Sequence, residues 1–323
     1  MNAVPVLQTL GLIGAGMAVF VIGLLTMRYG LTQAASSYTE RRIKTFVRTP
    51  ARGLLTGVAA TLVTQSSTAV TLISMGLVAA DILSFTDTIG IILGTNIGST
   101  LTVGLLSLNI ERIGPYLILT GLIAYLGALS LRRTAPRRRQ IGQFAISVIG
   151  FGTLFVGFHV MTAAAAPLAA SPGVTQALLV ARVHPFAGVL TGAVVTAVIG
   201  SSSASTALAL SLAKTGALPL VTAIAVVLGN NIGACATALL ASIGGNRSVQ
   251  RVAATHVLLN VCGVALFMLI LRPFAAVVSV LVRDPGGQVA LAHVLFNVIS
   301  SLLALPFVYR IAAWLEIILP ERA

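Results

Sequence analysis

The chain has 323 residues, of which 57% are hydrophobic and 8% are charged, and its mean hydropathy is +1.02. A soluble domain carries roughly 25% charged residues, so this composition excludes an ordinary soluble protein. The apolar runs are far longer than the about 10 residues of a barrel strand, which predicts an all-α polytopic membrane protein in a lipid bilayer. The net charge of +13 does not indicate a nucleic-acid partner, because the basic residues lie between apolar runs, where they report topology.

Two stretches of the chain match each other along their whole length without a gap. The first runs from Gly53 to Thr102 and the second from Gly188 to Thr237, so adding 135 to a position in the first gives its counterpart. Each stretch places a serine pair inside an apolar run and an Asn-Ile-Gly triplet some thirty residues later. A repeat of this length predicts two copies of one structural unit.

Repeat 1 is predicted over residues 1–131. It opens with an uncleaved span at 7–30 and a basic connector at 32–52. The apolar stretch 53–80 is broken at its middle by Thr64, Gln65, Ser66, Ser67 and Thr68, and each half is about 12 residues or roughly 18 Å of helix. Because a hydrocarbon core is about 30 Å thick, we expect a re-entrant hairpin. The repeat continues with a span at 84–107, interrupted by glycines that weaken the helix and free backbone groups, and a plain span at 113–131.

The same order returns after a basic loop at 132–140. Repeat 2 is predicted over residues 141–272, and its Gly150, Gly157 and Met161 echo positions 134 residues earlier in the first span. It comprises a span at 141–168, a hairpin at 188–215, an interrupted span at 219–243 and a span at 252–271. Residues 273–323 are expected to add a short interfacial segment at 274–282, one further span at 288–309 and a short tail without a soluble domain. The total is about seven full spans.

The basic residues predict the orientation of these spans. With the N-terminus outside and both hairpins non-spanning, fifteen of the 20 Lys and Arg residues fall in cytoplasmic segments, including the loop 132–140 and the C-terminus. This positive-inside bias gives each repeat three spans. Because an odd number of spans precedes the second repeat, the second repeat has the opposite orientation in the membrane. This predicts inverted repeats like those of many secondary transporters.

The hairpin tips have the chemistry of an ion site. A tip joins the carbonyl end of one half-helix to the N–H end of the next, and these ends suit a small cation and an anion, respectively. Serine and threonine hydroxyls can both donate and accept hydrogen bonds. No acidic residue lies deep in a span, Asp87 being the nearest, so neutral oxygens are expected to hold the cation.

Other polar residues have simpler interpretations. Small and hydroxylated residues pack helices together in membranes, and Thr56, Gly57, Thr61 and their counterparts are assigned to packing. His256 with Asn260, and His293 with Asn297, stand one turn apart and are expected to make interhelical hydrogen bonds, with their role left open. Cys235 and Cys262 are expected to be small core residues, and Arg247 and Arg251 topology determinants.

The repeated motifs resemble those of the sodium/phosphate cotransporter family, which has bacterial members and the type II sodium-dependent phosphate transporters of animals. The resemblance rests on QSSTAVT and LGTNIGST in repeat 1 and GSSSAST and LGNNIGA in repeat 2, and the later AHVLFN is similar to the bacterial branch. Where many members have a second glutamine this chain has Gly200, which removes one amide from the site. Many bacterial members also carry a PhoU-like domain, so we expect any such regulator to act in trans.

The resemblance implies a sodium-coupled phosphate transporter of the bacterial inner membrane, without enzymatic activity, cofactors or transition metals. Phosphate is then expected at Gln65, Ser66, Ser67, Thr68, Ser201, Ser202, Ser203, Asn96 and Asn231. Sodium is expected at Thr64, Ser66, Gly200, Ser201, Asn96, Asn230 and Asn231.

Two alternatives remain open at this point. In the first alternative, the chain exports phosphate or carries another oxyanion. In the second, the chain is a membrane subunit that transports nothing. The sequence does not give the direction of flux, the sodium stoichiometry or the oligomeric state.

Overall fold

The computed structural model describes residues 3–35, 47, 49–108, 111–131, 136–169 and 184–321, and among them the chain forms helices and no strands. The first half contains α1 (Ala3–Ala35), α3 (Pro50–Thr64), α4 (Ser67–Ala79), α5 (Phe85–Gly98), α6 (Thr100–Leu106) and α7 (Gly114–Ser130). The second half contains α8 (Pro136–Ala169), α10 (Pro185–Ile199), α11 (Ser202–Lys214), α12 (Leu220–Gly233), α13 (Cys235–Ser242), α14 (Arg247–Leu269), α15 (Leu271–Leu281), α16 (Pro285–Ala304) and α17 (Val308–Ile318). The prediction of an all-α polytopic membrane protein is confirmed.

The helices inside the repeat share their boundaries. α3, α4 and α5 begin and end 135 positions before α10, α11 and α12, and α6 and α13 also begin 135 positions apart. The offset of 135 residues between the matching sequences is therefore also the offset between the helix boundaries. The two copies fold as the same unit.

Glycine contacts give the direction of the helices within the unit. Gly53 of α3 lies against Gly90 of α5, Gly57 lies against Ile91, and Thr61 lies against Gly98. Residue numbers rise together in both helices, so α3 and α5 run parallel. The intervening α4 must turn back, and the turn between α3 and α4 lies level with the end of α5. The glycines of α12 make the equivalent contacts with α10.

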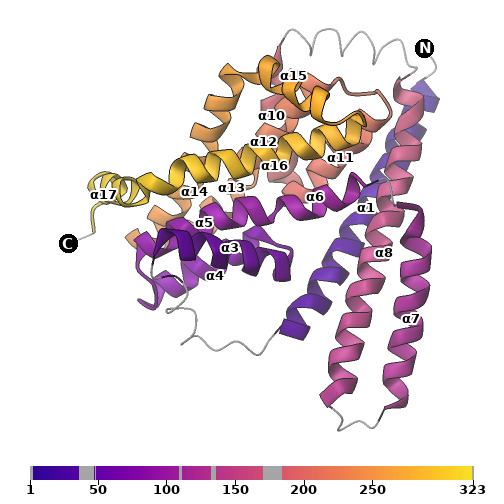
Figure 1. Cartoon of the computed structure of the whole chain (residues 1–323), viewed down its shortest axis with the longest axis horizontal. Helices are drawn as coiled ribbons and strands as arrows, with labels where there is room; N and C mark the ends of the chain where they lie inside the picture. Colours follow the sequence, from indigo (N-terminus) through magenta and orange to yellow (C-terminus); the bar gives the residue numbers. More distant parts are fainter. Residues whose placement is uncertain are drawn as a thin grey trace.

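α1 and α8, the first helices of the two halves, pack in the opposite sense. A Cβ on Gly23 would overlap Leu154, and a Cβ on Gly157 would overlap Phe20. Gly157 is the counterpart of Gly23 at the offset of 134, and Phe20 is the counterpart of Leu154, so the two contacts are equivalent. Residue numbers rise along α1 as they fall along α8, so the helices are antiparallel. Figure 1 shows α1, α7 and α8 side by side, with the repeat units beside them.

Within the described residues, six helical segments are long and apolar enough to cross a membrane: 8–33, 85–106, 137–165, 220–242, 247–269 and 285–318. They correspond to six of the seven predicted spans. The seventh is α7, which has 17 residues, the lower end of the range for spanning helices. Its Leu119, Ile123 and Leu126 are exposed, as expected for side chains that face lipid.

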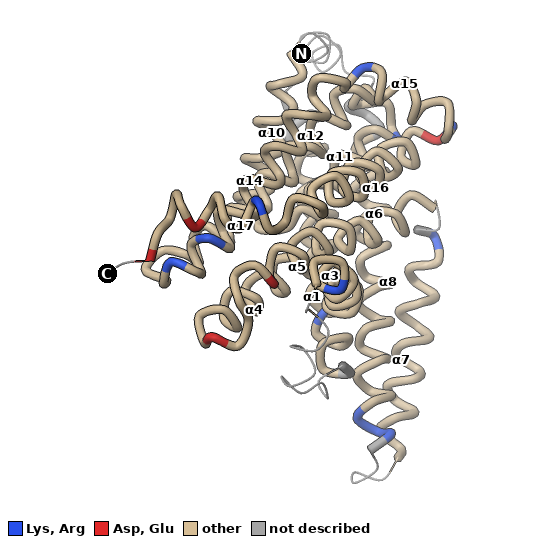
Figure 2. The backbone as a smooth tube through the Cα atoms, turned by 60° about the vertical axis from the view of Figure 1, so that its left-hand side comes forward, with Lys and Arg blue, Asp and Glu red and all other residues tan. Residues whose placement is uncertain are grey.

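Several of the basic residues in the described part of the chain, drawn blue in Figure 2, lie at helix starts. Arg52 lies in the first turn of α3, Arg137–Arg139 in the first turn of α8, and Arg272 in the first turn of α15. Most of the basic connector predicted at 32–52 and residues 132–135 of the basic loop lie outside the described residues.

The C-terminal part differs from the prediction. The span expected at 288–309 ends at Ala304, a 3-10 turn follows at Leu305–Phe307, and α17 then replaces the expected tail. Pro306 explains the break, because proline donates no N–H and clashes with the preceding turn. Arg251 fastens α17 to α14, since its Nε donates to the carbonyl of Leu319 at 2.9 Å and its guanidinium pairs with Glu321 at 2.7 Å.

Candidate functional site

The two turns inside the repeat units, here called tip 1 (64–68) and tip 2 (199–203), have one backbone conformation. Gln65 and Gly200 both adopt left-handed φ values, 51° and 71°. Ser66 and Ser201 follow with φ of −146° each. A left-handed conformation costs a non-glycine residue about 1–3 kcal/mol, so Gly200 is the relaxed residue and Gln65 the strained one. The backbone conformation of the tip therefore explains why glycine replaces glutamine in tip 2.

Serine caps the helix that leaves each tip. The Ser66 hydroxyl accepts the N–H of Ala69 at 3.1 Å, and the Ser201 hydroxyl accepts the N–H of Ala204 at 3.3 Å. The first N–H groups of α4 and α11 have no acceptor within their own helix. They belong to Ser67 and Thr68, and to Ser202 and Ser203, so each tip presents N–H groups and hydroxyls together at a positive helix end.

Three bonds hold Gln65 in its strained conformation. Its amide nitrogen donates to the carbonyl of Leu62 at 2.7 Å, its amide oxygen accepts from the hydroxyl of Thr102 on α6, and its carbonyl accepts from Nε of Arg28 at 2.7 Å. The side chains of Arg28 in α1 and Thr102 in α6 and a carbonyl of α3 thus fix one residue, as expected where strain is kept for function. α6 also packs against α11, so it contacts both tip 1 and the helix that begins at tip 2.

Arg28 is a candidate site residue that the sequence reasoning missed. We counted it with the basic residues of a cytoplasmic segment at 28–52, because it stands close to the end of the predicted span 7–30. α1 instead continues to Ala35, which places the half-buried guanidinium against tip 1. An available signal was that Arg28 stands apart from the other basic residues, the next being Arg41.

The interruptions of the two long spans are smaller than predicted. Ser99 and Ala234 stay in the right-handed region, and their N–H groups bond to the carbonyls of Thr95 and Asn230 at 3.0 Å each. The glycines around them do not unwind the helix. They let the backbones of neighbouring helices touch, since a Cβ on Gly94 would overlap the carbonyl of Leu54.

The asparagines of the two motifs are buried in α5 and α12. Asn96 is 8% exposed and Asn231 is 6% exposed, and the Asn231 amide donates to the carbonyl of Val227 in its own helix at 2.8 Å. Asn230 is fully buried against α10 and α11. Ser66 and Ser201 are half-buried, so the tips present more accessible polar groups than these asparagines.

A second pair of related helices flanks the repeat units. The sequences HVLLN in α14 and HVLFN in α16 are 37 positions apart. α14 packs against α4, α5, α12 and α13, whereas α16 packs against α11, α12, α5 and α6, which is the same set with the two copies exchanged. α14 and α16 are thus equivalent helices in the assembly, a relation that the sequence analysis did not draw.

The asparagine amides of this pair donate within their own helices, while Asn260 also bonds to the side chain of Cys235 in α13, an interhelical bond of the kind predicted. Asn260 and Asn297 each donate to the carbonyl of the histidine one turn earlier, at 2.9 Å. Nδ1 of His256 and Nδ1 of His293 are buried and have no hydrogen-bond partner. Cys235 is buried as predicted, while Cys262 is exposed, which corrects its assignment to the core.

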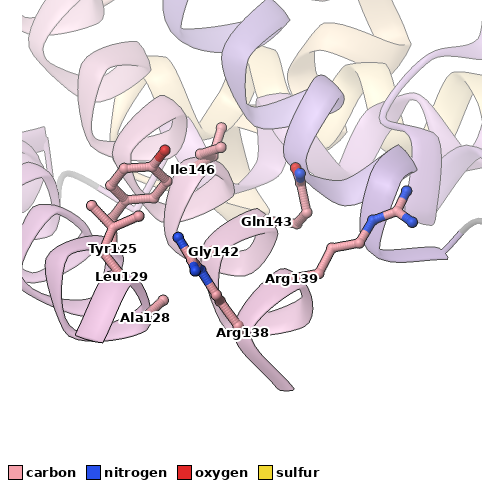
Figure 3. A pocket seen from close by; sticks show the side chains of 8 residues that line it. All are labelled: Tyr125, Ala128, Leu129, Arg138, Arg139, Gly142, Gln143 and Ile146. Atoms are coloured by element: carbon pink, nitrogen blue, oxygen red, sulfur yellow. The ribbon is translucent and has the colours of Figure 1, made fainter. Parts of the chain in front are cut away.

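An open pocket of about 280 Å³ lies elsewhere, between the ends of α7 and α8. Figure 3 shows Tyr125 beside Gly142, whereas Arg139 extends away toward α1. Arg139 bonds there to the side-chain oxygen of Gln33 at 3.3 Å. In Figure 1 these helix ends point away from α3 and α4, so this pocket is separate from the tips. No group of three or more His, Cys, Asp and Glu side chains suited to a metal ion occurs in the part of the chain that is described.

The fold and the doubled tips define a polytopic membrane protein with two matched helix-tip-helix units. Residues 19–163 and 165–283 match the family described as Na+/Pi-cotransporter. The chain belongs to this family.

Relatives agree with this assignment. "Uncharacterized protein YqeW" of Bacillus subtilis is 32% identical over 303 residues, which cover 94% of this chain and 96% of the relative. "Putative inorganic phosphate export protein YjbB" is 26% identical over 307 residues in Salmonella typhimurium and 25% identical in Escherichia coli. This chain spans 55% of the length of each YjbB protein. No solved structure matches the chain significantly.

Proposed function

We propose that this protein is a sodium-coupled inorganic phosphate transporter that works by alternating access in the bacterial inner membrane. The observation that carries the proposal is the pair of tips with closely similar backbone conformation, each presenting serine hydroxyls and helix N–H groups. Such groups suit a tetrahedral oxyanion. Arg28 adds a positive charge at tip 1, and arginine is well suited to phosphate.

The proposed architecture is a pair of inverted repeats with re-entrant hairpins. α1 and α8 are equivalent helices that run antiparallel, which supports opposite orientations for the two halves. Within each half the helices of the hairpin return to the side from which α5 or α12 starts, which supports re-entrance. Inverted units around a central site are typical of transporters that alternate between inward and outward access. The N-terminus is then outside and the C-terminus cytoplasmic.

The coupling is tested with the full chain in proteoliposomes. We expect uptake of labelled phosphate to rise at least tenfold when an inward sodium gradient replaces a choline gradient. A potassium gradient of the same size is the matched control for ionic strength and membrane potential. Equal uptake in all three conditions would contradict the sodium coupling and leave phosphate transport itself intact.

Export is the second candidate, and the printed names of the YjbB relatives favour it. The same vesicles distinguish the two directions when they are loaded with phosphate and diluted. Efflux that outpaces uptake under matched gradients favours export. Sulfate and arsenate competition in the same assay measures selectivity among oxyanions.

Removing the capping hydroxyls is a direct test of the tips. We expect Ser66→Ala and Ser201→Ala each to lower phosphate uptake about tenfold, since a hydrogen bond to a charged group contributes about 1.5–3 kcal/mol. The alanine variants also lose about 1 kcal/mol of helix capping, so a thermal melt must accompany the uptake assay. Ser130→Ala in α7, where the hydroxyl is exposed and bonds only within its helix, is the control. Normal uptake in both tip variants would place phosphate elsewhere.

A further inference from the structure

The two repeat units differ at one buried position, and the residue there determines whether the buried hydroxyl groups around it have hydrogen-bond partners. In repeat 2 that position is Asn230, which is 0% exposed. With its amide oriented to satisfy both ends, the nitrogen donates to the Thr196 hydroxyl at 3.1 Å and to the carbonyls of Gly192 and Val226 at 3.1 and 3.2 Å. The amide oxygen accepts from the hydroxyl of Thr206 at 3.0 Å. The side chain of Asn230 therefore joins α10, α11 and α12.

Repeat 1 has Thr95 at this position, and its side chain does not make these bonds. The Thr95 hydroxyl donates instead to the carbonyl of Ile92 in its own helix at 2.7 Å. The counterparts of Thr196 and Thr206 are Thr61 and Thr71, each 1% exposed. Both hydroxyls are buried without a hydrogen-bond partner. Because buried polar groups nearly always have a partner, these two require an explanation.

The walls around this position are the same in both units. Gly57 meets the carbonyl of Ile91 as Gly192 meets that of Val226, and Thr61 lies against Gly98 as Thr196 lies against Gly233. Repeat 1 thus retains the counterparts of the oxygens that surround the Asn230 nitrogen: the Thr61 hydroxyl and the carbonyls of Gly57 and Ile91. What it lacks is the positively polarised N–H2 group at their centre.

We propose that a monovalent cation, sodium under the proposed function, occupies this place in repeat 1. Its ligands are the hydroxyls of Thr61 and Thr71 and the carbonyls of Gly57 and Ile91. In repeat 2 the amide of Asn230 takes the place of the ion permanently, so the two halves hold one such ion between them. Hydroxyl and carbonyl oxygens suit a hard cation, and the absence of a carboxylate among these ligands favours a single charge over a double one.

This inference rests on the proposed function only for the identity of the ion. It also revises the interpretation of Gly57 and Thr61 as packing residues, and it gives Asn230 a role different from that of a sodium ligand. The site lies between α3, α4 and α5, one turn or more from Gln65 and Ser66, and is distinct from the sodium positions expected at the tips.

The test moves the amide from one repeat to the other. Purified full-chain protein is titrated with radioactive sodium in choline buffer, and bound ions per protein are counted. We expect Thr95→Asn to bind one sodium ion fewer than wild type and to melt at a higher temperature in sodium-free buffer, because the amide fills the site. Thr95→Val, which removes the hydroxyl without reaching Thr61 or Thr71, is the matched control and keeps the wild-type count.

A second variant covers the case in which Thr95→Asn does not fold. Thr71→Val keeps the side-chain shape and removes one ligand, so we expect the sodium affinity of this site to fall at least tenfold. An unchanged sodium count and affinity in both variants would overturn the proposal and leave a water molecule as the occupant. Loss of one bound ion in a protein whose phosphate uptake ignores sodium would refute the coupling and uphold the site.

Discussion

Arg28→Gln is expected to lower phosphate uptake by about 10- to 100-fold while the protein remains folded. The guanidinium lies half-buried at tip 1, and its Nε donates to the carbonyl of Gln65 at 2.7 Å. This bond holds the positive charge of Arg28 beside the tip that is proposed to bind phosphate. A hydrogen bond to a charged group contributes about 1.5–3 kcal/mol, and each 1.4 kcal/mol is tenfold. Uptake into proteoliposomes at several phosphate concentrations measures the effect.

Two further variants separate charge from geometry. Arg28→Lys keeps the charge but loses the planar fork, so we expect uptake between those of wild type and Arg28→Gln. Arg52→Gln removes an exposed charge at the start of the neighbouring α3 and is expected to leave uptake within about twofold. If Arg28→Gln transported like wild type, Arg28 would be only a structural cap for the end of α3.

The repeat was predictable because each copy buries the same pattern of side chains. The offset of 135 relates the ends of three helix pairs, and the polar break in 53–80 located tip 1. The left-handed turn was not predicted, although Gly200 at the matching position indicates it. When two copies share a left-handed backbone conformation, the copy with glycine at that position indicates the conformation more clearly in its sequence.

Tertiary contacts account for what the sequence did not show. The glycines near Asn96 and Asn231 were interpreted as helix breakers, whereas their lack of a side chain serves the contact with α3 and α10. The pairing of α14 with α16 depends on which helices surround them, and a motif of five residues did not reveal it. Arg28 was missed because topology rules assign a basic residue near a span end to the loop.

The pairing of α1 with α8 carries the second large prediction. Gly23 and Gly150 face each other, and a Cβ on Gly150 would overlap the backbone nitrogen of Met27. Gly16 and Gly157 repeat the arrangement, with the carbonyl of Gly16 within 2.7 Å of the position of a Cβ on Gly157. Helices approach this closely in membranes through small residues, since van der Waals packing drives their association. We expect Gly150→Leu to destabilise the protein by more than about 3 kcal/mol, because backbone atoms cannot move aside as side chains do.

Size-exclusion chromatography and a thermal melt of the detergent-purified protein measure this effect. We expect Gly150→Leu to elute as aggregate, and Gly157→Leu to behave in the same way because the two positions are equivalent. Gly14→Leu in α1 is the matched control, since Gly14 is exposed and nothing lies within 4 Å of its added Cβ. The control should elute and melt like wild type. A monodisperse Gly150→Leu with an unchanged melting temperature would show that α1 and α8 do not pack through these glycines, and the antiparallel pairing that supports inverted repeats would lose its basis.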